Sequence, residues 1–421
     1  MIAAPAPRVV EQGAIAAVLC MIASTPRARV RTECIGVHLV GAVRHCPGMP
    51  GTVVVAAGGT GGHIYPGLAL AGAVRELAPA RRVVVVGTPR GLESELVPKA
   101  GYPLRLVDMV PFAGSARWRL PLAMVRATAQ ARRLLREEEA AVAVGMGGYA
   151  SLPVIAAARL AGVPALVHES GAVPGKANRV NARLTRRVAL AFPPPPGATW
   201  PPSGIETRVV GMPLGADLLG FDRERLRPEA RSALGVPEGT KLVLVNGGSQ
   251  GAASLNRLAV GLARRWQGRD DVRILLKAGA RNHEAVAAEL ADADPAGVVE
   301  LTRFIERMDH AYAAADVAVC RAGAGTVAEL AVVGLPAVLV PYPHATEDHQ
   351  TANARTLADT GGALLVPDDE ATADAVGPQL EARLEQPGGL DEMRAALRTE
   401  ARPRAAEALA AWALELAGDR G

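Results

Sequence analysis

Residues 52–77 read TVVVAAGGTGGHIYPGLALAGAVREL and combine three structural signals in one stretch. Val53–Ala57 is a short apolar run without polar alternation, which is typical of a strand buried on both faces. A glycine-rich turn follows at 58–62, and an apolar pattern from about Tyr65 to Leu77 predicts a helix. A strand, a glycine loop and a helix in this order are the opening unit of a doubly wound α/β domain.

The same alternation continues along both halves of the chain. In the first half, further buried strands are predicted at Val83–Val86, Ala141–Val144 and Ala165–His168. In the second half, a strand at Leu242–Val245 leads into a glycine loop at 247–251 and a helix to about Trp266, and strands follow at Val272–Leu276, Val298–Leu301, Val317–Cys320 and Ala337–Val340. The pattern predicts an α/β protein with two Rossmann-like doubly wound domains facing a cleft.

The composition changes between the two halves. Six of the ten residues 193–202 are proline, and GMPLG at 211–215 precedes the point where the pattern restarts. We expect a first domain at 49–212, a second at 213–400, and a C-terminal helix at 401–421 that could pack back on the first domain. Residues 1–48 are expected to be a disordered leader or a mis-assigned start, with Met49 just before the first strand.

The bulk composition excludes several classes of protein. Of 421 residues, 49% are hydrophobic and 21% charged, which suits two globular cores. The net charge of +4 fits an anionic ligand or membrane surface and is too small to indicate nucleic acid. Four cysteines without a CxxC pair disfavour a zinc ribbon or a thioredoxin-like site. No apolar run reaches the roughly 18 residues of a membrane helix.

Glycines between a strand and a helix let the backbone approach an anion at the helix N-terminus, so the first loop is expected to bind phosphate. The third glycine of the dinucleotide pattern is replaced by Ile64, and no acidic residue follows the strand Val83–Val86. The Gly-Lys-Ser/Thr of a P-loop is also missing, so NAD and ATP are disfavoured. Further glycine loops at 145–148 and 247–251 suggest two anionic ligands, a nucleotide donor and a phosphorylated acceptor.

Six motifs together resemble one family. In order they are GGTGGHIYPGLALA (58–71), VGTPRGLESELVPKAGYPL (86–104), GMGGYAS (145–151), GGSQGA (247–252), CRAGAGTVAEL (320–330) and DHQTANA (348–354). They are similar to the MurG family, the N-acetylglucosaminyltransferases of peptidoglycan synthesis, and the resemblance covers about 52–400. It implies a GT-B fold, an inverting mechanism and no obligatory cofactor. A divalent cation is not indicated.

The resemblance also implies the ligands and their contacts. The donor would be UDP-GlcNAc, and the acceptor would be a lipid-linked muramyl-pentapeptide diphosphate. The protein would act at the cytoplasmic face of the cell membrane. Donor contacts are implied at Thr60, Gly61, Gly62, Gly171, Ser249, Ile305, Ala324, Gly325, Thr326, Val327, Ala328, Glu329 and Gln350. Acceptor-diphosphate contacts are expected at Gly58, Gly59, Gly147, Gly148 and Tyr149.

The reaction needs a base, because a sugar hydroxyl loses its proton as it attacks the anomeric carbon. His63 matches the candidate base of the family, and an imidazole titrates near neutral pH. Glu169 is the rival base. Simpler alternatives exist for three of these residues. His63 could only cap its helix, Glu329 could only compensate the helix dipole, and Gln350 could lie on a helix surface. His344 and His349 beside Asp348 lack further ligands, so no metal site is expected.

Three positions depart from the family. Its HEQN reads His168-Glu169-Ser170-Gly171, so a sugar-contacting Asn becomes Gly171. The family's GNPV motif, which an Arg follows in some members, corresponds to GMPLG at 211–215, so that Arg is missing. The family's GALT motif corresponds to GAGT at 323–326, so its large apolar residue is missing. A UDP-sugar 2-epimerase of the same fold and a non-catalytic nucleotide-sugar sensor are the competing functions.

Residues 107–136 mix apolar and cationic side chains. Phe112, Trp118, Leu120 and Leu122 stand among Arg117, Arg119, Arg126, Arg132, Arg133 and Arg136. Apolar side chains ringed by arginine suit an anionic bilayer surface, which would be the inner membrane leaflet. An ordinary amphipathic helix packed on its own domain is the alternative.

Overall fold

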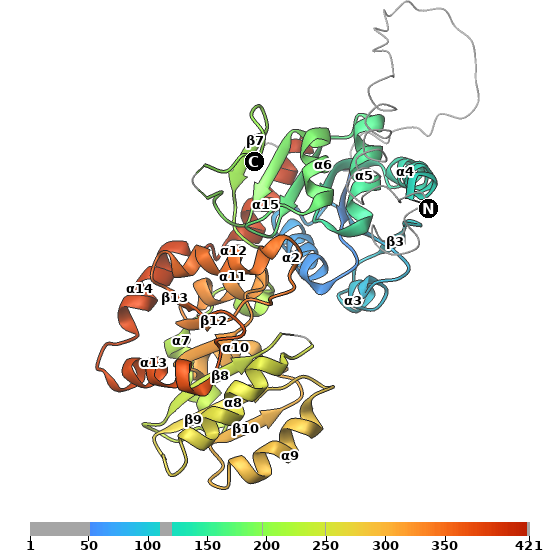
Figure 1. Ribbon diagram of the computed structural model, residues 1–421. Helices are drawn as coiled ribbons and strands as arrows, with labels where there is room; N and C mark the ends of the chain where they lie inside the picture. Colours follow the sequence, from blue (N-terminus) through green and yellow to red (C-terminus); the bar gives the residue numbers. More distant parts are fainter. Residues whose placement is uncertain (1–50, 110–119, 196, 249, 419–421) are drawn as a thin grey trace, which may run out of the picture.

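The computed structural model of the chain describes residues 51–418 except 110–119, 196 and 249 (Figure 1). The expected leader, Ser249, and the aromatic side chains of Phe112 and Trp118 therefore lie outside the described residues.

The first domain is a seven-stranded parallel sheet with the strand order β3-β2-β1-β4-β5-β6-β7. Its elements are β1 (Thr52–Ala56), α2 (Gly61–Leu77), β2 (Val83–Gly87), α3 (Glu93–Lys99), β3 (Leu104–Leu106), α4 (Leu120–Glu137), β4 (Ala140–Gly145), α5 (Gly148–Ala161), β5 (Ala165–Glu169), α6 (Lys176–Thr185), β6 (Arg187–Leu190) and β7 (Glu206–Val209).

The second domain is a six-stranded parallel sheet with the order β10-β9-β8-β11-β12-β13. Its elements are η2 (Ala216–Leu218), α7 (Arg223–Ala233), β8 (Lys241–Asn246), α8 (Ala253–Arg265), β9 (Val272–Lys277), α9 (His283–Ala293), β10 (Val299–Thr302), α10 (Met308–Ala314), β11 (Val317–Cys320), α11 (Ala324–Val333), β12 (Ala337–Leu339), η3 (Thr346–Asp348), α12 (His349–Ala358), β13 (Ala363–Leu365), α13 (Ala373–Glu385) and α14 (Asp391–Glu400). The last helix of the chain is α15 (Ala405–Leu416).

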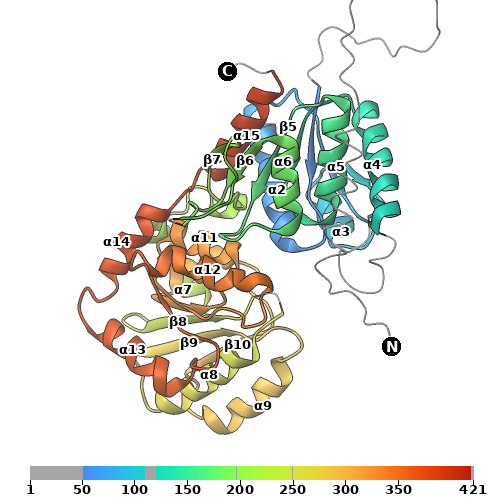
Figure 2. The same ribbon diagram turned by 45° about the horizontal axis from the view of Figure 1, so that its top comes forward.

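Strand β1 explains why its sequence shows no polar alternation. Val53 and Val55 pack with α2 and α15 on one face of the sheet, whereas Val54 and Ala56 pack with α4 and α5 on the other. Every side chain of β1 is buried, so both of its faces must be apolar. The two predicted doubly wound sheets are thus confirmed (Figures 1 and 2).

Several boundaries differ from the prediction. Helix α2 begins at Gly61 and not near Tyr65, because Thr60 is extended and the last two glycines of the loop already form the first helical turn. The strands β3, β6, β7 and β13 were not predicted; each has only three or four residues, and β3 and β7 are largely exposed. Strands of three or four residues are too short to show a clear apolar pattern in the sequence.

The chain crosses between the domains twice. After β7 it enters the second domain, and after α14 it returns, so that α15 lies on the first domain beside α2 (Figures 1 and 2). The two segments that connect the domains are in contact. Gly211 in the first segment has φ 93°, and a Cβ there would overlap the side chain of Arg402 in the second.

Candidate active site

The first glycine loop is held by a buried carboxylate. Glu93 at the start of α3 is fully buried, and its Oε1 accepts hydrogen bonds from the amide and the hydroxyl of Thr88 at 2.7 and 2.9 Å. Its Oε2 accepts the Gly59 amide at 3.2 Å. A buried carboxylate needs such donors, so Glu93 fixes the loop between β1 and α2. The sequence analysis gave this residue no role, although it lies within the quoted GLESEL motif.

The second loop, at 145–148, interlocks with the first. Gly147 and Gly148 have φ 94° and 75°, a region that L-residues rarely adopt. A Cβ on Gly148 would overlap the carbonyl oxygen of Gly58, and one on Gly147 would lie 2.7 Å from the His63 ring. The Tyr149 ring lies 3.6 Å from the place of a Cβ on Gly59. The helices α2 and α5 therefore both begin at this contact.

His63 lies in the first turn of α2, between the two loops. Its Nδ1 is 3.2 Å from the hydroxyl of Thr60, and the ring also hydrogen-bonds to the backbone of Gly58. Burial lowers the pKa of His63 below its ordinary value, against the opposing effect of the Gly58 bond. The imidazole is therefore neutral at physiological pH and able to accept a proton.

Glu169, the rival base, ends β5 and is buried. Its carboxylate accepts the amides of Gly171 and Gly175 at 3.0 and 2.9 Å, and the Asn178 side chain donates to it at 3.0 Å. Burial raises the pKa of Glu169, and these hydrogen bonds oppose the rise. The carboxylate thus holds the 170–175 loop closed through three hydrogen bonds.

His168, next to it, is fully buried and has a structural role. Its Nε2 donates to the Gly211 carbonyl at 2.9 Å, in the connection between the domains. Burial lowers the pKa of His168 to about 4.

The second domain presents its own glycine loop after β8. Gly248 and Gly251 have φ 83° and 74°, and a Cβ on Gly251 would overlap the Ala278 carbonyl. The loop leads into the N-terminus of α8, and α11 begins nearby, after the neighbouring strand β11. Two helix N-termini at one sheet edge favour the binding of an anion.

Helix α11 carries six of the thirteen predicted donor residues. Ala324, Gly325, Thr326 and Glu329 are partly accessible, whereas Val327 and Ala328 are buried. Glu329 accepts a hydrogen bond from the hydroxyl of buried Tyr312 at 2.6 Å. Burial raises the pKa of Glu329, and Lys277 opposes that rise.

Two further predicted donor residues of this domain are Ile305, on the loop after β10, and Gln350, in the first turn of α12. Ile305 is buried after β10, and Phe304 before it is 64% exposed. The side-chain oxygen of Gln350 accepts the Tyr342 amide at 3.0 Å, so Gln350 also holds the loop after β12.

Direct contacts join the two domains at Gly171. The Ala172 amide donates to the side-chain oxygen of Asn353 at 2.9 Å, and the Asn353 amide group donates to the Ala322 carbonyl at 3.1 Å. Arg179 of α6 pairs with Glu347 at 3.0 Å. The 170–175 loop is therefore connected to the start of α11 by a buried side chain, which the sequence analysis did not identify.

In the part of the chain that the structure describes, there is no group of three or more His, Cys, Asp or Glu side chains placed to hold a metal. The same residues contain no helix long and apolar enough to cross a membrane.

Comparison with known proteins identifies the family. Residues 53–190 match the glycosyltransferase family 28 N-terminal domain, and residues 242–409 match the C-terminal domain of that family. The fold is also similar to that of a kitacinnamycin glycosyltransferase, at TM-score 0.61 and 20% identity over 86% of this chain and 98% of that one.

Two relatives are named UDP-N-acetylglucosamine–N-acetylmuramyl-(pentapeptide) pyrophosphoryl-undecaprenol N-acetylglucosamine transferase. The protein of Mycolicibacterium vanbaalenii is 41% identical over 87% of this chain and 90% of its own length. The protein of Saccharopolyspora erythraea is 43% identical over 87% and 94%. The crystal structure of Acinetobacter baumannii MurG superposes with TM-score 0.70 at 33% identity, covering 87% of this chain and all of that one. The chain therefore belongs to glycosyltransferase family 28 and, within it, to the MurG N-acetylglucosaminyltransferases of peptidoglycan synthesis.

Proposed function

We propose that this chain transfers GlcNAc from UDP-GlcNAc to a lipid-linked N-acetylmuramyl-pentapeptide diphosphate, with inversion at the anomeric carbon. The names of its relatives support these substrates. The observation that carries the proposal is the interlocked pair of glycine loops, which places the neutral imidazole of His63 between two helix N-termini. Such N-termini favour a diphosphate, and the imidazole beside it supplies a base.

The donor is assigned to the second domain. The amides at the N-termini of α8 and α11 face the diphosphate, and Ser249 on the loop before α8 is the expected side-chain contact. Glu329 accepts the ribose hydroxyls, because a carboxylate suits a diol. The backbone of Ile305 meets uracil. Gln350 and the loop at Gly171 are assigned to the GlcNAc hydroxyls.

The acceptor is assigned to the first domain. Its diphosphate lies against Gly58, Gly59 and the second loop, with Thr60 to Gly62 between acceptor and donor. His63 takes the proton of the acceptor hydroxyl as that oxygen bonds to the anomeric carbon. The bond from that carbon to UDP breaks on the opposite side, and its electron pair goes to the β-phosphate. The helix N-termini stabilise the charge that develops there.

Of the two candidate bases, the geometry favours His63. Glu169 already accepts three hydrogen bonds that close its loop, so we assign it to positioning Gly171. His63→Ala is expected to reduce turnover about 10²-fold and to leave UDP affinity unchanged. As the pH is lowered, the activity of the parent should also fall. Because the pKa of His63 is lowered, this loss should begin only below the ordinary histidine pKa.

A single-turnover assay with UDP-GlcNAc and lipid acceptor tests the proposal. A lipid-linked disaccharide is the expected product. Release of an epimerised UDP-sugar would indicate a 2-epimerase, and binding without product would indicate a sensor. Normal turnover in His63→Ala would move the base role to Glu169.

We also propose that the enzyme is a peripheral protein on the cytoplasmic face of the cell membrane. Met124, Ala127 and Ala131 bury one side of α4 in the first domain. On its other side Leu122 and Val125 are 64% and 47% exposed, among the exposed Arg126, Arg132, Arg133 and Arg136. The helix is thus packed and still offers an apolar, cationic face that suits an anionic bilayer.

Vesicle flotation tests the membrane assignment. Leu122→Ser combined with Val125→Ser is expected to release the protein from anionic vesicles while UDP binding is kept. The parent should bind less as salt rises, because each arginine contributes about 1 kcal/mol that salt screens. A double variant that floats like the parent would place the docking surface elsewhere.

A further inference from the structure

Lys277 is the last residue of β9, the strand beside the edge strand β10 in the second sheet. The register pairs it with Asn246, the last residue of β8, on one side and with Thr302, the last residue of β10, on the other. The chain continues from Asn246 into the glycine loop at 247–251 and from Thr302 toward Phe304 and Ile305. Lys277 therefore stands between the loop assigned to the diphosphate and the loop assigned to uracil.

The side chain of Lys277 is buried without a matching acceptor. It is 7% exposed, and none of the hydrogen bonds or ion pairs of the described residues reaches its ammonium. Nζ lies 5.2 Å from the centroid of the Phe304 ring, and Phe304 is itself mostly exposed. The stem of the side chain is buried whereas Nζ is not enclosed, so the ammonium at this sheet edge is open to an oxygen from outside the chain.

Burial lowers the pKa of Lys277, and the carboxylate of Glu329 opposes this. The other groups that affect Glu329 are the hydroxyl of Tyr312 and the carboxylate of Asp217. None of the three forms a recorded ion pair with Lys277. The ammonium thus lies within electrostatic reach of the residue assigned to the ribose, beside the residue that precedes the uracil contact.

We propose that the ammonium of Lys277 donates a hydrogen bond to an oxygen of the uridine part of the donor, a uracil carbonyl or a ribose hydroxyl. The inference rests on the proposed function, since it requires a uridine nucleotide at this sheet edge. Phe304 and Glu329 both flank the nucleoside side of the site, which favours uridine over the diphosphate as the partner. Lys277 is then a donor-binding residue that the sequence resemblance does not include.

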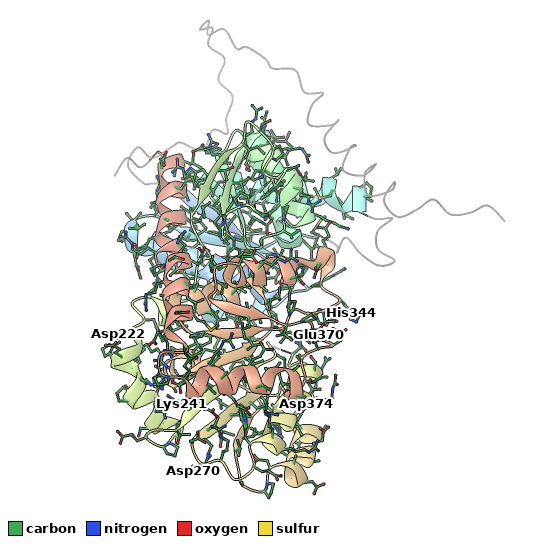
Figure 3. All side chains as sticks on the ribbon, turned by 60° about the vertical axis from the view of Figure 1, so that its left-hand side comes forward. Asp222, Lys241, Asp270, His344, Glu370 and Asp374 are labelled. Carbon is green, nitrogen blue, oxygen red and sulfur yellow. The ribbon has the colours of Figure 1, made fainter. Side chains whose placement is uncertain are left out.

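Calorimetric titration of UDP and UMP into the parent and three variants tests the proposal. Lys277→Met keeps the length of the side chain and removes the charge, and Lys277→Arg keeps the charge. Lys241→Met is the matched control, because Lys241 is exposed at the opposite end of the neighbouring strand β8 (Figure 3). Thermal melting without ligand is measured for each protein.

Lys277→Met is expected to weaken UDP and UMP by the same factor, about tenfold or more, because hydrogen bonds from charged donors are the stronger ones. Its melting temperature without ligand should equal or exceed that of the parent, since a buried charge is removed. Lys277→Arg should recover part of the affinity. Lys241→Met should bind like the parent.

Four results would overturn the assignment. Unchanged affinity in Lys277→Met would make the lysine a structural residue. A loss for UDP but not for UMP would place the ammonium on the β-phosphate. Recovery of affinity in Lys277→Met as the pH is raised would mean that the lysine acts only by keeping Glu329 ionised. A parent that binds neither nucleotide would overturn the proposed function together with this inference.

Discussion

Replacing Gly148 by alanine tests whether the interlocked loops assemble the active site. Gly148 has φ 75°, and Gly162 at the other end of the same helix has φ 73°. Alanine in this left-handed region costs about 1–2 kcal/mol at either position. The two positions differ in space, because a Cβ on Gly162 meets nothing within 4 Å whereas one on Gly148 overlaps the Gly58 carbonyl. Gly162→Ala is therefore the matched control.

The overlap at Gly148 involves backbone on both sides, so no side-chain rotation relieves it. The two loops must separate by about 1 Å, a displacement that can reduce a rate by about 10² when it moves reacting groups. Gly148→Ala should thus reduce turnover by about that factor, while Gly162→Ala keeps nearly the parent rate. Both should lower the free energy of unfolding, with the larger loss in Gly148→Ala.

Urea denaturation gives the stability of each variant, and single turnover with UDP-GlcNAc and lipid acceptor gives the rate. UDP affinity, measured by calorimetry, should be the same in all three proteins because the donor is assigned to the other domain. A Gly148→Ala protein with the stability and turnover of Gly162→Ala would refute the view that contact between the loops positions the base.

Two further predictions concern ionisable groups. Glu329→Ala should weaken UDP at least about tenfold, since hydrogen bonds to a charged acceptor are lost, and unchanged affinity in calorimetry would remove Glu329 from the ribose site. His168 should make stability fall as pH falls from about 6.5 toward 4, because the unfolded chain then binds a proton that the folded chain, with a pKa of about 4, does not. The loss is about 3 kcal/mol across that window. This pH-dependent loss should be largely absent from His168→Gln when the midpoints of urea unfolding are compared. An equal dependence of stability on pH in both proteins would contradict the assignment to His168.

Local sequence was enough to predict the two sheets and the place of the glycine loops. Val53–Ala57 and Leu242–Val245 are apolar at every position because both faces of a central parallel strand are covered. The prediction failed for short peripheral strands such as β7, whose residues are mostly exposed and leave no continuous apolar run.

The family could also be predicted from the sequence, because six motifs in fixed order are independent of how the chain folds back on itself. Which residues meet could be learned from the folded structure alone. Glu93 holds Gly59, Gly148 packs on Gly58, and Lys277 stands between Asn246 and Thr302. Each of these contacts joins residues on different strands or their loops, and strand order and register bring them together. Glycine and apolar patterns act over a few residues, so they predict an element but not its neighbour in the sheet.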